Sequence, residues 1–376
     1  MAGLRALPAA PVERAAELLV ADQVEALVRH GWQPAEIHRV GRRLHTVTGR
    51  LVAVHLRHHL DDHLRRHGAD LVDPRWRDQV DGLGEVSPGP RWYAAWRERC
   101  RLDPGTAYHR TGELLVRLGA LPALHALLPP PGDVTSSHVV ASASDPVLQK
   151  VRGLLAKAES TEFEAEAAAL TAKAQELMTR HAIDRAALHV GQAVGRPSII
   201  RVAIEAPYVD PKSLLLQLVA AQTRCRTVFL SGLDMSEVIG FPADLDAVEV
   251  LFTSLLIQAQ RALAEAGSAG GAYARTRSSS FRATFLRSYA IRIGERLAET
   301  NAHVMAGSRA DSARYLPVLR SQEEAIEEHV AREYGTLSSG PLRGGYDHAG
   351  ATRGRWAADQ AQLSGGHLDP GSPASS

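Results

Sequence analysis

The residues that first suggest chemistry are histidines. Residues 55–67, HLRHHLDDHLRRH, hold five of them: His55, His58, His59, His63 and His67. Four of these follow one another at intervals of four, and on a helix each such step rises about 6 Å and turns about 40°. A metal–nitrogen bond is only about 2 Å long, so one ion can bind a single neighbouring pair. The spacing makes His59 and His63 the candidate metal ligands, with the remaining ligands supplied by another segment.

A second interpretation places the same histidines on the flank of a core helix. The helix that carries them has an apolar stripe formed by Val52, Leu56, Leu60 and Leu64. Imidazoles beside such a stripe can lay the ring against the edge of the core and keep a polar tip in water. The H-x-x-x-H pattern also lacks the intervening glutamate of a zinc protease. We favour this interpretation over the metal site.

Arginines near residue 280 are candidates for nucleic-acid contact. Arg275, Arg277 and Arg282 flank a run of serines, and guanidinium groups in such a strip can bind phosphates. Further along, Arg292 and Arg296 alternate with glutamates, which predicts a solvated face with local ion pairs. No aromatic alternation for base stacking accompanies the strip. We assign the predicted contact to the first three arginines.

A glycine-rich turn, SSGPLRGGYDHAG, precedes the last expected helix. Backbone N–H groups at Gly344 and Gly345, together with the Arg343 side chain, could hold an anion there. The turn lacks the G-K-[ST] ending of a Walker loop, so it predicts no nucleotide site of that kind.

The helix after this turn carries a strip of small residues: Gly350, Gly354, Ala357, Ala358 and Ala361. Such a strip predicts close approach by another helix. Tyr346, Asp347 and His348 are of types that serve acid–base chemistry, but adjacent residues on a helix diverge by about 100°. Packing is therefore the role that we expect for this segment.

The composition indicates a globular protein without a strong overall field. Its 376 residues include 43 basic and 42 acidic side chains, a balance that does not favour polyanions in general. Cys100 and Cys225 are far apart and form neither a disulfide framework nor a zinc knuckle. The N-terminus lacks a signal-peptide pattern, and no uninterrupted apolar stretch approaches the ~18 residues that span a bilayer. We expect a cytoplasmic protein with no membrane partner.

Helical spacing dominates the first part of the chain. Residues 1–128 are expected to form a helical N-terminal domain, and the proline- and serine-rich residues 129–144 a linker. A capping box then joins Thr161 to Glu164. It predicts a helical hairpin over residues 145–190.

The remainder combines strand-like and helical runs, and we expect an α+β domain over residues 198–364. The strand-like runs are 201–209, 226–231 and 236–241, with a hairpin turn around Gly232 between the last two. Helices are expected at 244–266 and 281–301, and a disordered tail at 365–376. The predicted fold class is α+β, mostly α: a helical N-terminal domain, a linker, a helical hairpin, and a small antiparallel sheet covered by helices.

The segment KVRGLLAKAESTEFEAEAAALTAKAQELMTRHAID resembles the bacterial family called domain of unknown function 2786. The positions that carry the resemblance are Lys150, Leu154, Leu155, Ala158, Thr161, Glu164, Ala165, Ala168, Ala174, Leu177, Met178, His181, Ile183 and Asp184. Where the family often has glycine after the histidine, this chain has Ala182, which changes how the C-cap of the helix can close.

Other segments are similar to the companion domain 7168, which often follows this family in bacterial and phage proteins. They are VIGFPADLDAVEVLFTSLL, SFRATFLRSYAIRIGERL and GGYDHAGATRGRWAADQAQL. The front of the chain, with GWQPAEIHRVGRRL and DPRWRDQV, is similar to the N-terminal region of long actinobacterial members. The resemblance implies no particular activity.

The sequence lacks the short motifs that usually mark an enzyme. It contains no nucleophile elbow, zinc-protease helix or dinucleotide fingerprint, and no motif implies a cofactor. We therefore expect a non-enzymatic interaction or scaffold protein, with nucleic acid or another protein as its partner class. The alternative is a metal-assisted hydrolase that uses histidines of residues 55–67 or His181.

Overall fold

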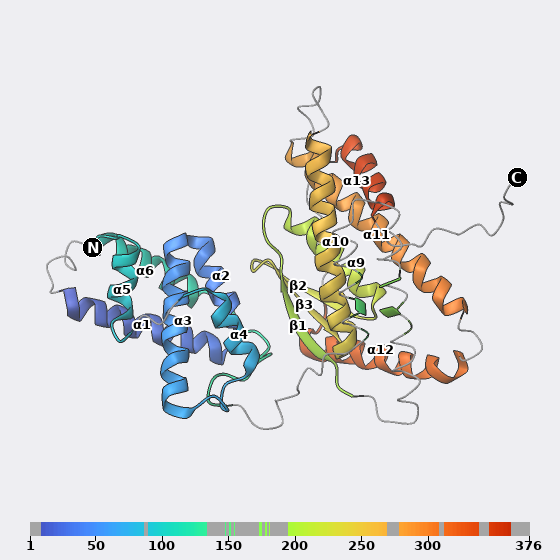
Figure 1. Ribbon diagram of the computed structural model, residues 1–376. Helices are drawn as coiled ribbons and strands as arrows, with labels where there is room; N and C mark the ends of the chain where they lie inside the picture. The colour runs from blue at the N-terminus through green and yellow to red at the C-terminus, as the bar shows by residue number, and fades with distance from the viewer. Residues whose placement is uncertain are drawn as a thin grey trace, which may run out of the picture. The chain divides into compact units, whose positions relative to one another are not determined.

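The computed structural model describes residues 9–85, 89–133, 195–268, 278–307, 312–337 and 346–361, with single positions between 147 and 180. The chain divides into two compact units, Met1–Ala141 and Ser142–Ser376, called here the first and second units. Each has its own buried core, and each is described by itself (Figure 1).

The described part of the first unit is helical. Its helices are α1 (Ala9–Arg29), α2 (Pro34–Leu44), α3 (Thr46–His67), α4 (Pro74–Gly82), α5 (Trp92–Arg99) and α6 (Pro104–Gly119). The N-termini of α4 and α6 follow directly from the sequence. Asp73 and Asp103 cap these helices, and a proline occupies the first helical position of each.

Helix α3 is the central element of the first unit and contacts each of its five other described helices. Residues 51–56 are all buried, so this stretch is surrounded on every side. A helix that is enclosed in this way must place every side chain against protein, including any polar one. The histidine positions are set by this arrangement.

A segment after α6 closes the first unit. The indole N–H of Trp32 donates to the Pro122 carbonyl at 2.8 Å. Leu124 N–H donates to the His30 carbonyl at 2.8 Å, and Gly132 N–H to the Leu71 carbonyl at 2.9 Å. Residues 122–132 thus run from the end of α1 to the end of α3.

The second unit contains a three-stranded antiparallel sheet in the order β1-β3-β2. The strands are β1 (Ser198–Ala203), β2 (Arg226–Leu230) and β3 (Met235–Gly240). The predicted hairpin is confirmed, because β2 pairs with β3 across the turn at Gly232. The expected first strand, 201–209, is corrected to Ser198–Ala203. The strand ends before residue 207 because Pro207 has no N–H for a ladder and Tyr208 has a left-handed backbone.

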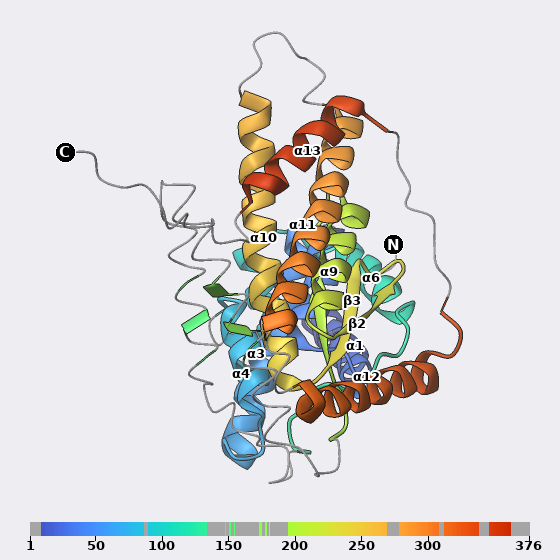
Figure 2. The ribbon, with the colours of Figure 1, turned by 90° about the vertical axis from the view of Figure 1, so that its right-hand side faces the viewer.

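Helices cover both faces of this sheet, as the α+β prediction requires. They are α9 (Val209–Gln222), α10 (Pro242–Ser268), α11 (Ser279–Gly307), α12 (Ser312–Tyr334) and α13 (His348–Gln360). Ile200, Val202 and Val238 face a large core built from α9, α10, α11 and α13. Val228 and Ile239 face Ile326 and Val330 of α12, which crosses the direction of α10 (Figures 1 and 2).

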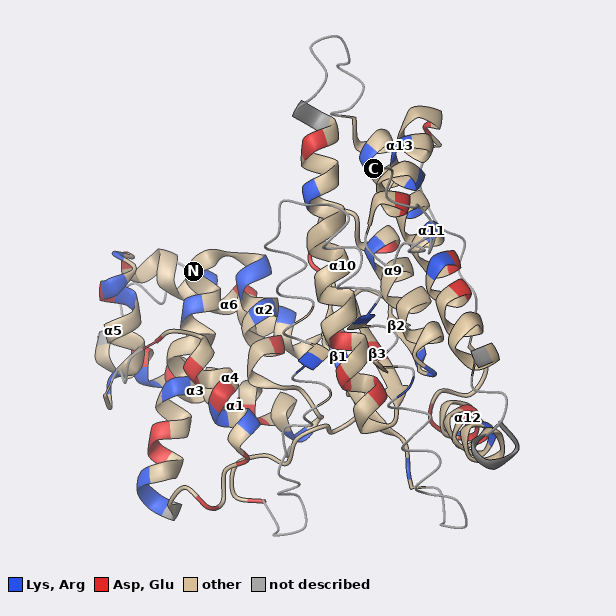
Figure 3. Ribbon diagram, turned by 45° about the vertical axis from the view of Figure 1, so that its right-hand side comes forward, with Lys and Arg blue, Asp and Glu red and all other residues tan. Residues whose placement is uncertain are grey.

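Helix α10 is long and apolar enough, by length and composition alone, to cross a membrane. Figure 3 shows its middle without charged residues, while Arg261 and Glu265 lie toward its C-terminal end. Val248, Leu251 and Leu255 of this helix belong to the core of the second unit.

The two cysteines are free and lie in different units. Cys225 is 1% exposed, and burial raises the pKa of its thiol. A Cβ atom at Gly240 would collide with its sulfur, so the thiol is enclosed by β3.

The closest helix pairing in the second unit joins α11 to α13. A Cβ atom at Gly350 would lie 2.6 Å from the Phe281 carbonyl oxygen, and one at Gly354 would collide with the Phe285 carbonyl oxygen. Both contacts advance by four residues along each helix, so α11 and α13 run parallel and begin at the same end (Figure 2). The predicted close approach along the small-residue strip is confirmed.

Arg296 corrects the prediction of a solvated face on α11. Its side chain donates to the carbonyls of Ala358 and Ala361 at the end of α13, and the residue is 8% exposed. Desolvation lowers the pKa of its guanidinium. Arg292 behaves as expected and pairs with Glu295 at 3.0 Å.

Replacing Gly354 by alanine tests this backbone contact. Gly354→Ala is expected to lower the free energy of unfolding by about 1–3 kcal/mol, because the added methyl group overpacks the helix contact. Gly112→Ala is the matched control, since its Cβ atom would meet nothing within 4 Å on α6. There, alanine should stabilise by about 1 kcal/mol. Denaturant unfolding of both variants checks the opposite signs, and a stabilised Gly354→Ala protein would contradict the close packing.

A buried charged network lies between the sheet and α12. Arg201 and Glu237 face each other across β1 and β3, with a nitrogen–oxygen distance of 3.4 Å and side chains 0% and 1% exposed. The Tyr334 hydroxyl donates to the other Glu237 carboxylate oxygen at 2.6 Å. Burial and the adjacent carboxylate raise the pKa of Tyr334.

Replacing one partner of the Arg201–Glu237 pair should destabilise the protein more than replacing both. Glu237→Leu removes the carboxylate that faces the buried Arg201 charge and is expected to cost about 3–5 kcal/mol of unfolding free energy. The double variant Arg201→Leu/Glu237→Leu should be the more stable of the two. Equilibrium denaturation measures both, and a double variant less stable than the single one would refute the coupling.

Candidate functional site

His55 lies at the centre of the first unit. The residue is 3% exposed, and its Nδ1 atom is buried without a hydrogen-bond partner. Its ring centroid is 5.1 Å from that of Trp92 and 6.1 Å from that of His59. The expectation that these imidazoles keep a polar tip in water is therefore wrong for His55, because α3 is enclosed at this position.

Burial keeps the side chains of His55, His58 and His59 uncharged near pH 7. Desolvation, followed by the neighbouring His59 and His58, lowers the pKa of His55 to about 3. Desolvation is also the largest cause that lowers the pKa of His58 and of His59. His55, His58 and His59, called here the histidine cluster, are therefore neutral hydrogen-bonding groups near pH 7.

The predicted metal ligands His59 and His63 lie one turn apart on α3. Among the described residues, no group of three or more His, Cys, Asp or Glu side chains could hold a metal ion. The acids on the outer part of α3 are engaged by arginines instead: Arg57 pairs with Asp61, and Arg66 with Asp62. The side chain of His67 and all of His181 lie outside the described residues, so the metal assignment stays a prediction.

His55 should make the free energy of unfolding depend on pH. Near pH 6.5 the unfolded chain protonates at His55, while the folded chain does so only near pH 3. The stability that neutral His55 contributes is present above pH 6.5 and is lost progressively as the pH falls toward 3, by about 1.4 kcal/mol per pH unit.

His55→Leu removes this titration. Between about pH 7.5 and about pH 4.5 the variant should lose roughly 2–3 kcal/mol less stability than the wild type. His109→Gln, at a half-exposed side chain on α6, is the control and should follow the wild type. Urea unfolding at the two pH values gives the comparison, and parallel losses in wild type and His55→Leu would show that His55 is not the titrating group.

The parallel starts of α11 and α13 form the second candidate region. Ser278 accepts from Phe281 N–H at 3.0 Å, and Asp347 accepts from Gly350 N–H at 2.8 Å, so each start has its own cap. Asp347 N–H also donates to the Thr284 hydroxyl at 3.1 Å, which joins the two starts. Arg282 is half-buried here and forms no ion pair with any described residue.

Exposed aromatic side chains accompany this region. Tyr346, just before α13, is 72% exposed, and Trp356 on α13 is 63% exposed. His348, Thr352 and Trp356 follow one another at intervals of four and are all exposed, so they form one stripe opposite the glycine contacts. Sequence reasoning missed Trp356, although its place between Gly354 and Ala357 could have shown that it points away from the small-residue strip.

Several predicted site residues lie outside the described residues, so the structure places none of them. They are Arg275, Arg277, Arg343, Gly344 and Gly345.

Comparison with known proteins connects one segment of the chain to a family. No curated protein and no solved structure matches the chain. Described residues of the segment that does match a family model, Val151, Ala174 and Met178, belong to the core of the second unit. That match covers residues 147–185, and the family is described as "Protein of unknown function (DUF2786)".

Proposed function

We propose that the protein is a non-enzymatic interaction protein whose second unit binds single-stranded nucleic acid. The binding surface is formed by Arg282, Tyr346 and the exposed stripe of α13, and is called here the α13 surface. The observation that carries the proposal has two parts: Arg282, which forms no ion pair with a described residue, and the exposed Tyr346 lie at two adjoining helix starts, and Trp356 lies about two turns further along the exposed stripe of α13.

The charge at the adjoining N-termini of α11 and α13 favours binding of a phosphate. Helix N-termini carry partial positive charge, and here two of them adjoin. Residues 278–287 contain no acidic side chain, and the Asp347 carboxylate is occupied as a cap. Arg282, which forms no ion pair with a described residue, therefore supplies a positive charge for contact with the nucleic-acid backbone.

The exposed rings suit bases. Aromatic side chains bind single strands by stacking, which tolerates any sequence because every base has a π-face. Trp356 and Tyr346 are too exposed to serve the core of the second unit. This combination also explains how a chain with a net charge of only +1 can bind a polyanion locally.

Two substitutions separate the two contributions. Trp356→Ala should weaken binding of a single-stranded oligonucleotide by about 1–3 kcal/mol without changing the dependence on salt. Arg282→Ala should lower the slope of log K against log salt by about 0.7, the value for one phosphate contact. Fluorescence anisotropy over a range of salt concentrations measures both effects.

Arg332→Ala is the matched control, because it removes an arginine that is 64% exposed on α12, on the other face of the sheet. It should leave both affinity and slope unchanged. No salt-sensitive binding by the wild type, or equal losses in Arg332→Ala and Arg282→Ala, would reject the α13 surface.

Two further assignments belong to this proposal. We assign residues 198–364 to the companion domain 7168 and the whole chain to the long actinobacterial architecture, on the sequence segments that resemble them. The free thiols of Cys100 and Cys225 support a reducing, cytoplasmic location.

A further inference from the structure

The α13 surface has a defined length, because the packing of α11 against α13 fixes the level of each residue along the two helices. The contact between Gly350 and Phe281 repeats four residues later on both helices, so the two parallel helices advance in step (Figure 2). On this register Trp356 lies at the level of Arg287. The levels of the phosphate-binding and base-stacking groups can therefore be compared.

A short distance separates Trp356 from the basic end of the α13 surface. Trp356 lies five residues beyond Arg282 on the shared register and nine residues beyond Asp347, the N-cap of α13. At a rise of about 1.5 Å per residue, these separations are about 8 Å and about 13 Å along the helix axis. A stacked strand carries one phosphate per about 3.4 Å, so about two to four nucleotide steps join the two ends.

Acidic side chains limit the surface beyond Trp356. Asp359 follows Trp356 by three residues and is also exposed, so it lies on the same side of α13, one turn further along. A phosphate that followed the strand past Trp356 would meet this carboxylate. Asp359 belongs to an ion-paired group in which three acids meet two arginines: Asp359, Glu295, Glu299, Arg292 and Arg355.

We infer, on the basis of the proposed function, that the α13 surface binds a segment of about four nucleotides, with one backbone phosphate at the adjoining helix starts and one base stacked on Trp356. A mononucleotide occupies only one end of this surface, and a dinucleotide is too short to reach both. A longer strand gains no further contact, because its next phosphate faces Asp359. The ligand class is therefore a short tract within a single strand.

Trp356 provides the signal for measuring this length. All five tryptophans of the chain lie in described segments, and four of them are only 1–2% exposed, against 63% for Trp356. A base that stacks on Trp356 therefore quenches the fluorescence of an indole that solvent already reaches. Trp356→Phe, which keeps an aromatic ring, identifies the signal by its loss.

A series of oligothymidylates of increasing length, titrated into the intact chain, tests the inference. The dissociation constant should fall at least about five-fold between about two and about five nucleotides, because only the longer strand reaches both contacts. From about five to about ten nucleotides, the slope of log K against log salt should stay at about 0.7, the value for one phosphate contact.

Asp359→Asn tests the limit beyond Trp356. Without this carboxylate the strand can continue along the surface, so the affinity for about ten nucleotides should rise at least about three-fold more than the affinity for about four. Glu324→Gln is the matched control, because it removes one exposed carboxylate from α12, on the other face of the sheet. It should leave both affinities unchanged.

Absence of saturable, salt-sensitive binding of the longest strand would overturn both the α13 surface and its length. Three other results would overturn the length alone: a dinucleotide that binds as tightly as the longer strands, a salt slope that keeps rising with strand length, or equal effects of Asp359→Asn on short and long strands. An affinity that levels off near about four nucleotides, with the slope of one phosphate, supports the inference.

Discussion

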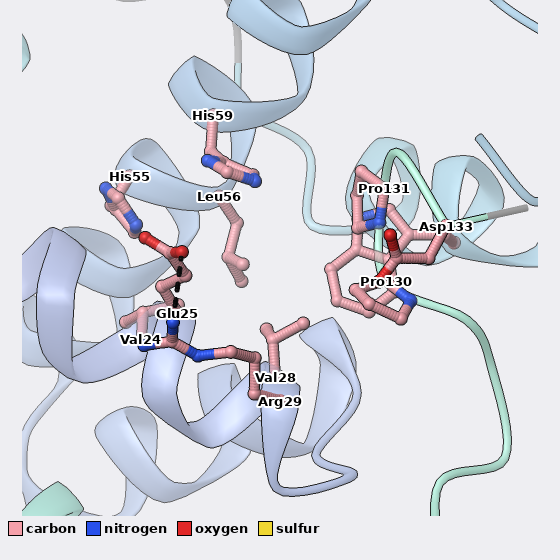
Figure 4. A pocket seen from close by; sticks show the side chains of 11 residues that line it. Val24, Glu25, Val28, Arg29, His55, Leu56, His59, Pro130, Pro131 and Asp133 are labelled. Carbon is pink, nitrogen blue, oxygen red and sulfur yellow. Dashed lines mark ion pairs between the residues drawn. The ribbon is translucent and has the colours of Figure 1, made fainter. Parts of the chain in front are cut away.

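The complete enclosure of α3 over residues 51–56 is the constraint around which the first unit is built. A helix surrounded by five others leaves its polar side chains no route to water, so His55 must be neutral and must lie against rings. Beyond residue 56 only one face of the same helix stays in the core, where Leu60 is buried, and the other faces carry Arg57, Asp61 and Asp62 in ion pairs. One continuous helix therefore joins an apolar environment to a solvated one, and two cavities beside α3, one of which Figure 4 shows, lie where the two meet.

In the second unit, backbone contact between α11 and α13 has a comparable role. The absence of side chains at Gly350 and Gly354 lets α13 lie directly on the carbonyls of α11. Arg296 then covers the free carbonyls at the far end of α13, where a helix has no partners of its own. This contact fixes the rotation of α13, and the rotation in turn sends Trp356 outward.

Periodicity in the sequence was enough to find α3, α10, α11, the β2–β3 hairpin and the small-residue strip of α13. It did not find α12, although Leu319, Ile326 and Val330 have helical spacing, and Pro317 lies inside the helix. Burial of His55 and Arg296 could not be read locally, because the elements that cover them are remote in sequence. The pairing of Arg201 with Glu237 depends on strand register, which only the assembled sheet defines.

The distribution of thiols has a practical consequence. Cys100 is partly exposed at the end of α5, while Cys225 is enclosed against Gly240. An alkylating reagent added to the native chain therefore meets Cys100 first, and it reaches Cys225 only after the sheet edge has opened. The time between alkylation of Cys100 and alkylation of Cys225 therefore reports the rate of local opening in the second unit. Mass spectrometry of the intact polypeptide can measure it.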